Sequence, residues 1–178
     1  MLQKVFGFGS IAGVIVAIPL FGMAVAMNGQ PPPWYGVALG YATMLIALTL
    51  VFIAIKRHRD MDLGGVIRFW PAFGLGLGIS LVASIFYVFA WEAALVVTGM
   101  DFAGDYTRML IEQQRAQGVT DEALAEFTAE MQQFARKYAN PLYRIPLTFI
   151  EIFPIGVLVS LVSAGLLKNS RFLPARRS

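Results

Sequence analysis

Residues 72–98 read AFGLGLGISLVASIFYVFAWEAALVVT, and this stretch decides the fold. It contains no lysine or arginine, and its one charged side chain is that of Glu92. A helix needs roughly 20 apolar residues to cross a bilayer, because each residue adds about 1.5 Å across a hydrocarbon core of about 30 Å. The stretch is therefore predicted to be a membrane-spanning helix, long enough to tilt or to protrude.

Three more runs of this kind occur, at residues 5–27, 34–55 and 145–167, and the only charged residue in them is Glu151. The composition agrees, since 57% of the 178 residues are hydrophobic and 14% are charged, against about 25% charged in a soluble domain. Small residues recur four positions apart in every run, which favours close helix packing in lipid. These pairs are Gly9 with Gly13, Gly36 with Gly40, Gly74 with Gly78, and Gly156 with Ser160. The prediction is an all-α integral membrane protein with a four-transmembrane-helix bundle.

The first run has a second interpretation, a cleaved signal peptide, because Lys4 precedes it and Ala24-Val25-Ala26 resembles a cleavage site. We expect the run to be retained, because it is longer than the apolar core of a usual signal peptide. The bases cluster beside the predicted spans in segments 1–4, 56–71 and 168–178, whereas segment 101–144 carries most of the acids. Because cytoplasmic segments are enriched in Lys and Arg, both termini are expected in the cytoplasm.

Three segments connect the predicted spans. Residues 28–33 contain three consecutive prolines and are predicted to form a short outer turn. Segment 56–71 is predicted to be an inner loop, and the LGG at 63–65 within it is predicted to stop the helix. Its bases either contact lipid headgroups or serve only as the positive-inside signal, and the second interpretation is favoured. These bases are Lys56, Arg57, Arg59 and Arg68.

Segment 101–144 is predicted to be an extracytoplasmic helical hairpin between the third and fourth spans. Gly118 closes its first helix, Thr120 caps the second, and Asn140-Pro141 ends the second. An apolar face with helical spacing runs along the second helix, through Leu124, Phe127, Met131, Phe134 and Tyr138. The apolar faces of the two helices could pack together, lie on the outer leaflet, or bind a protein partner or a second copy of the chain.

Glu92 and Glu151 form the candidate intramembrane polar site, together with Tyr87 and Arg144. Each glutamate lies six residues from the outer end of its predicted span, so both are about 9 Å below the outer surface. An acid inside a span is a functional-site candidate, because a carboxylate in hydrocarbon is costly.

Two interpretations of this site stay open. Two carboxylates in contact would share a proton and could carry protons or cations. Alternatively, the acids belong to a structural clasp, in which a base of the hairpin reaches down and Tyr87 or Tyr143 donates a hydrogen bond. The candidate bases are Arg108, Arg136, Lys137 and Arg144. The clasp is favoured, because no polar trail continues towards the inner side.

The sequence offers no catalytic set. It has no cysteine, and its one histidine, His58, lies among positive charges, so the usual zinc and histidine-based designs are not expected. We expect no enzyme activity, no cofactor and no metal. The net charge of +3 is too small to suggest nucleic acid.

Several motifs together resemble a family of bacterial inner-membrane proteins known only as domain of unknown function 4199. They are IKRHRD at 55–60 with LGG at 63–65, YV at 87–88, WE at 91–92, KY at 137–138, NPL at 140–142, Arg144, Glu151, FP at 153–154, Gly156 and SLVSA at 160–164. The resemblance implies a four-helix protein of the bacterial inner membrane with its first span retained. It implies no activity.

Two functions therefore compete. The first is a non-enzymatic bundle that engages a protein partner or lipid through the outer hairpin and the basic inner loop. The alternative is a small proton or cation transporter, or a channel subunit, that uses Glu92 and Glu151.

Overall fold

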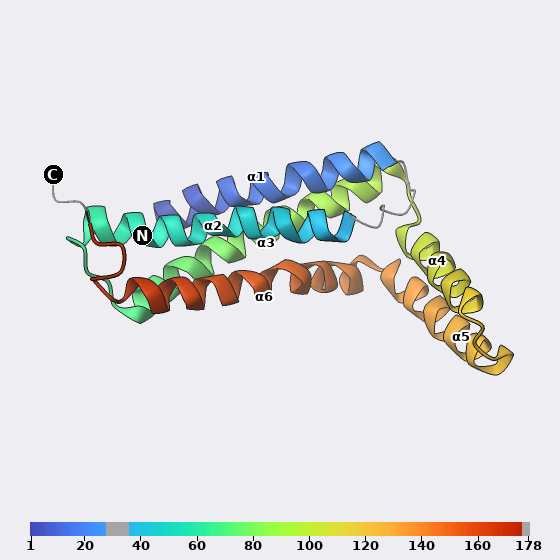
Figure 1. The fold of residues 1–178 in the computed structure, drawn as a ribbon. Helices are drawn as coiled ribbons and strands as arrows, with labels where there is room; N and C mark the ends of the chain where they lie inside the picture. The colour runs from blue at the N-terminus through green and yellow to red at the C-terminus, as the bar shows by residue number, and fades with distance from the viewer. Residues whose placement is uncertain (28–35, 176–178) are drawn as a thin grey trace.

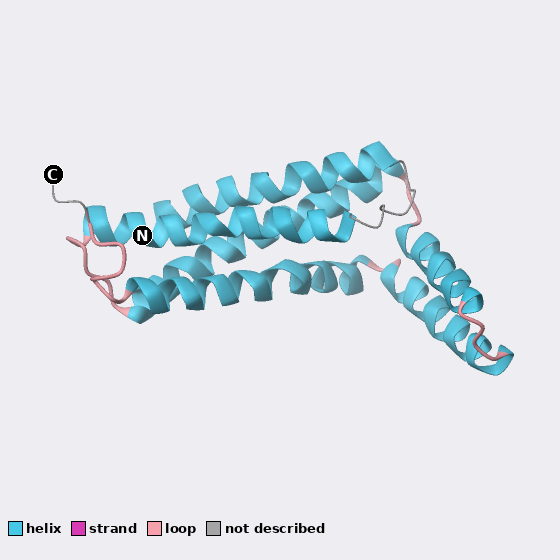
Figure 2. Cartoon of the chain, viewed as in Figure 1, coloured by secondary structure: helices cyan, strands magenta, loops and turns pink. Residues whose placement is uncertain are grey.

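The computed structural model describes residues 1–27 and 36–175, and within these ranges the chain forms six α-helices and no strand (Figure 2). They are α1 (Leu2–Met27), α2 (Gly36–Asp62), α3 (Phe69–Thr98), α4 (Phe102–Ala116), α5 (Asp121–Tyr138) and α6 (Pro141–Leu167). The prediction of an all-α protein is confirmed. Four helices, α1, α2, α3 and α6, are long and apolar enough to cross a membrane, and each contains or overlaps a predicted span. The predicted turn at 28–33 lies outside the described residues.

The four long helices pack lengthwise, with α3 between α1 and α6 and with α2 against α1 and α6 (Figure 1). The long helices approach one another most closely at glycines. A Cβ on Gly13 would lie 2.6 Å from the Cβ of Phe86, and a Cβ on Gly156 would lie 2.6 Å from the Cβ of Ser80. These α1–α3 and α3–α6 seams have no room for a larger residue.

The predicted small-residue pairs are only partly used. Gly9 and Gly13 contact α3, and Gly156 with Ser160 faces Gly76 and Ser80. By contrast, a Cβ on Gly40 or Gly74 would meet no atom within 4 Å. Periodicity alone therefore identified the packed face of α1 and of α6. On α3 it named Gly78, where a Cβ would lie 3.0 Å from the Val5 side chain, but it also named Gly74 and missed Gly76.

Helix α2 continues past its apolar part to Asp62, so the first part of the predicted inner loop is helical. Two side-chain pairs one turn apart support this extension, Lys56 with Asp60 at 2.5 Å and His58 with Asp62 at 2.5 Å. The helix ends as predicted at the glycines, since Gly64 and Gly65 have φ values of 64° and 93°.

Helices α4 and α5, together called the arm, lie side by side and project beyond the ends of the long helices (Figure 1). The predicted helix-end signals are present, but α6 begins at Pro141, so the last four residues of the predicted segment 101–144 belong to α6. The Thr120 hydroxyl accepts from the Ala123 amide at 3.4 Å, α5 ends at Tyr138, and Gly118 has a φ of 73°. The sequence prediction missed the second role of Asn140, whose side chain accepts from the Leu142 amide at 3.0 Å and caps α6.

Candidate functional site

Glu92 on α3 forms a two-pronged ion pair with Arg144 in the first turn of α6. The Arg144 Nε donates to Glu92 Oε1 at 2.7 Å, and its Nη2 donates to Oε2 at 2.5 Å. The side chains are 13% exposed for Arg144 and 23% exposed for Glu92. This is the ion pair of the clasp that the sequence suggested, with Arg144 as the base. The hydrogen bond predicted from Tyr87 or Tyr143 is not formed to Glu92 among the described residues. Because Arg144 already balances the charge of Glu92, the pair gives no support to a proton shared between the two glutamates.

The same arginine holds the base of the arm through Tyr138, the last residue of α5. Arg144 Nη1 donates to the Tyr138 carbonyl at 3.3 Å, and the guanidinium lies 5.8 Å from the centre of the Tyr138 ring. Trp91 on α3 donates from Nε1 to the Tyr138 hydroxyl at 2.8 Å. Burial raises the pKa of Tyr138, so its hydroxyl remains protonated at neutral pH. Residues 91 and 92 of α3 therefore both fasten the arm to the long helices.

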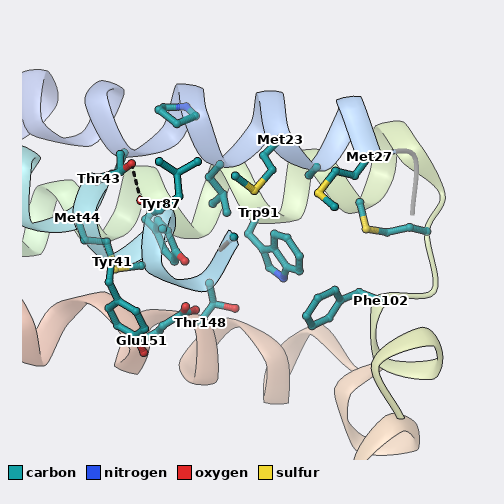
Figure 3. A pocket seen from close by; sticks show the side chains of 18 of the residues that line it. Met23, Met27, Tyr41, Thr43, Met44, Tyr87, Trp91, Phe102, Thr148 and Glu151 are labelled. Atoms are coloured by element: carbon teal, nitrogen blue, oxygen red, sulfur yellow. Dashed lines mark hydrogen bonds between the residues drawn. The ribbon is translucent and has the colours of Figure 1, made fainter. Parts of the chain in front are cut away.

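A cavity of about 310 Å³ lies beside this junction, and all six helices contribute to its wall (Figure 3). Most of the lining is apolar and flexible, with Met23, Met27, Met44 and Met100 among it. Five aromatic side chains also face it, those of Tyr41, Tyr87, Trp91, Phe102 and Tyr138. The volume falls at the lower end of the range of about 300–1,000 Å³ that is usual for small-molecule sites.

Glu151 is the only carboxylate among the residues that line the cavity. It lies on α6 near the Tyr87 and Thr148 side chains, as Figure 3 shows. Within the described ranges no Lys, Arg or His side chain forms an ion pair with it. The predicted site therefore contains two acids with different surroundings. Glu92 belongs to the clasp and does not line the cavity, whereas Glu151 faces the cavity without a cation beside it.

The basic residues predicted for the inner loop also have different surroundings. Arg57 and Arg68 are exposed, and Lys56 pairs with Asp60. Arg59 was predicted to contact lipid headgroups or to act as a topology signal. Its side chain is fully buried, which argues against headgroup contact and does not bear on the topology signal. Its guanidinium donates to the carbonyls of Phe172 at 2.9 Å and Leu173 at 2.5 Å. Arg59 therefore fastens the segment after α6 to the end of α2, and burial keeps it away from any headgroup.

Sequence reasoning did not find the cavity. Its lining residues come from six helices, and an apolar residue at helical spacing has the same pattern whether it faces lipid, the core or a cavity. The only sequence signals were Glu151 and Tyr87. Among the described residues, no group of three or more His, Asp or Glu side chains could hold a metal ion.

The helices and the site define a class, an all-helical protein with four helices suited to membrane spans and an apolar cavity where the arm joins them. The chain belongs to the family described as "Protein of unknown function (DUF4199)", whose model matches residues 7–169. This confirms the resemblance that the sequence motifs indicated. No curated protein and no solved structure matches the chain.

Proposed function

We propose that the chain is a non-enzymatic protein of the bacterial inner membrane that binds a small amphiphilic or lipid-like molecule in the cavity. In this proposal α1, α2, α3 and α6 form a four-helix transmembrane bundle with both termini in the cytoplasm, and the arm is extracytoplasmic. The proposal rests on one observation, the cavity of about 310 Å³ with a largely apolar lining and a few polar groups.

The chemistry of the lining supports binding and offers little for catalysis. Methionine side chains adapt to ligands of irregular shape, and aromatic rings provide large contact areas with few rotatable bonds. Among the described residues of the lining, the ionisable groups are one carboxylate and three tyrosines, those of Tyr41, Tyr87 and Tyr138. A nucleophile with an adjacent base, the usual minimum for covalent catalysis, is not part of this set.

The arm supports a role for the cavity on the outer side. The clasp and the Trp91–Tyr138 hydrogen bond hold the arm where Phe102 and Tyr138 complete the cavity wall. With the arm outside, as proposed, the cavity lies towards the outer leaflet.

The experiment uses Trp91, which lines the cavity, as a fluorescent reporter. Trp34→Phe and Trp70→Phe leave Trp91 as the single tryptophan of the chain. The purified protein, in nanodiscs of phosphatidylglycerol, is titrated with 1-bromo-4-neopentylbenzene, an uncharged apolar probe whose bromine quenches tryptophan on contact. We expect saturable quenching.

Two matched variants distinguish the cavity from the surrounding lipid. Gly40 lines the cavity and Gly74 does not, and a side chain at either position starts in open space. Gly40→Phe fills the cavity and should abolish the saturable quenching, whereas Gly74→Phe should leave it intact. Equal quenching in the two variants would contradict the proposal, because the probe would then reach Trp91 from the bilayer.

A further inference from the structure

The two glutamates near the arm differ in whether the chain provides a positively charged partner for them. Glu92 has its positive partner within the chain, at 2.5 Å from Arg144. Glu151, an exposed residue, has no such partner among the described residues. The described wall around it is largely apolar, with the hydroxyls of Thr43, Thr148 and three tyrosines among its other polar groups. A charge in surroundings of low polarity is costly unless it is paired. A positive charge on a ligand in the cavity would pair with Glu151 as Arg144 pairs with Glu92.

The other lining residues indicate which class of cation the cavity could bind. A metal ion needs several oxygen or nitrogen ligands, about six to eight oxygens for calcium, and Glu151 is the one carboxylate in the lining. The faces of aromatic rings instead attract organic ammonium groups, which are large and weakly hydrated. Tyr41, Tyr87 and Tyr138 come from three different helices, and all three line the cavity together with Glu151. Figure 3 labels Tyr41, Tyr87 and Glu151.

We propose that the cavity binds an organic cation, an ammonium group that Glu151 and the tyrosine rings contact, attached to an apolar body that the methionines contact. This inference rests on the proposed function and specifies its ligand class. The ammonium group can belong to a phospholipid headgroup or to a free amphiphilic amine, and both sources share this chemistry. An anionic ligand is disfavoured, because it would bring a second negative charge to Glu151.

The test compares two probes of the same shape in the Trp91 reporter protein. The 4-bromobenzyltrimethylammonium ion differs from 1-bromo-4-neopentylbenzene only in having a charged nitrogen where the isostere has a carbon. Glu151→Gln keeps the size of the side chain and removes its charge. We expect it to weaken binding of the cation about tenfold or more, as for other close charge pairs, and to leave the affinity of the neutral probe unchanged.

A second variant tests the aromatic part separately. Tyr41 is 47% exposed, so Tyr41→Leu should not disturb the core. We expect it to weaken the cation about two- to thirtyfold, in keeping with the usual strength of a cation on an aromatic face, and the neutral isostere much less.

The outcomes separate the two proposals. One outcome would refute only the cation inference. In it, Gly40→Phe abolishes binding of the neutral probe, but Glu151→Gln changes the affinities of the two probes equally or changes neither. The proposed function would then stand. If neither probe gives saturable quenching, both are wrong. If the inference holds, adding phosphatidylethanolamine to the nanodiscs identifies the source. Competition with the bromobenzyl cation indicates a lipid headgroup, and no competition indicates a free amine.

Discussion

Replacement of Arg59 tests whether a buried arginine holds the segment after α6 in place. Arg59→Met keeps an unbranched chain of similar length but removes every donor of the guanidinium. The side chain is fully buried, and its guanidinium donates hydrogen bonds to the carbonyls of Phe172 at 2.9 Å and Leu173 at 2.5 Å. A hydrogen bond from a charged donor contributes about 1.5–3 kcal/mol, so the two together stabilise the docked segment by about 3 kcal/mol at the lower limit. We therefore expect the undocked population to rise about 100-fold.

Limited trypsin digestion in detergent measures this population, because cleavage of a segment that opens and closes rapidly follows its open fraction. The product to quantify by mass spectrometry is the fragment cut after Arg171. Arg57 provides the matched control, since it lies on the same helix but is exposed, and its one side-chain hydrogen bond to a described residue is to the Met61 sulfur, at 3.2 Å. Arg57→Met should leave the rate of this cleavage unchanged. If the two variants are cut at Arg171 equally fast, the buried arginine does not hold the segment.

Two further predictions concern the long helices, and both are measured as free energies of unfolding in mixed micelles with a denaturing detergent. Glu92→Gln and Arg144→Gln should each lower the free energy of unfolding by about 2–3 kcal/mol, which is less than the loss for a fully buried pair. The double variant should lose clearly less than the sum of the two single losses. Simple additivity would mean that Glu92 and Arg144 do not act as a pair. Gly13→Ala should cost about 1–3 kcal/mol, because the new Cβ would lie 2.6 Å from Phe86, whereas Gly22→Ala, with nothing within 4 Å, should be nearly neutral. Equal effects of the two alanines would refute the close α1–α3 seam.

Much of the fold could be predicted because its signals are local. Length and apolarity located the four long helices, and the side-chain oxygen of Thr120 and the φ values open to Gly64 and Gly118 fixed helix ends. Each of these effects depends on a few neighbouring residues. Arg144 as the partner of Glu92 was one of several bases considered, because sequence gives the depth of a residue in a helix more readily than the direction of its side chain.

The features that sequence reasoning missed depend on contacts between distant segments. Arg57 and Arg59 differ by two positions in a run of bases, yet one is exposed and the other is buried against residues more than 100 positions away. The number of bases in a segment does not tell which of them is exposed and which is buried. The cavity was missed for the same reason, since it is a property of how six helices meet.

Tyr138 connects the clasp to the cavity. Its carbonyl accepts from Arg144, its hydroxyl accepts from Trp91, and its ring lies 5.9 Å from that of Phe102. Tyr138, Trp91 and Phe102 all line the cavity, so part of the cavity wall is set by the position of the arm. Any force that tilts the arm must either break the contacts of Tyr138 or move this wall. A ligand that fits the cavity only when the wall is in place would therefore also stabilise the arm, because binding and arm position share the same contacts.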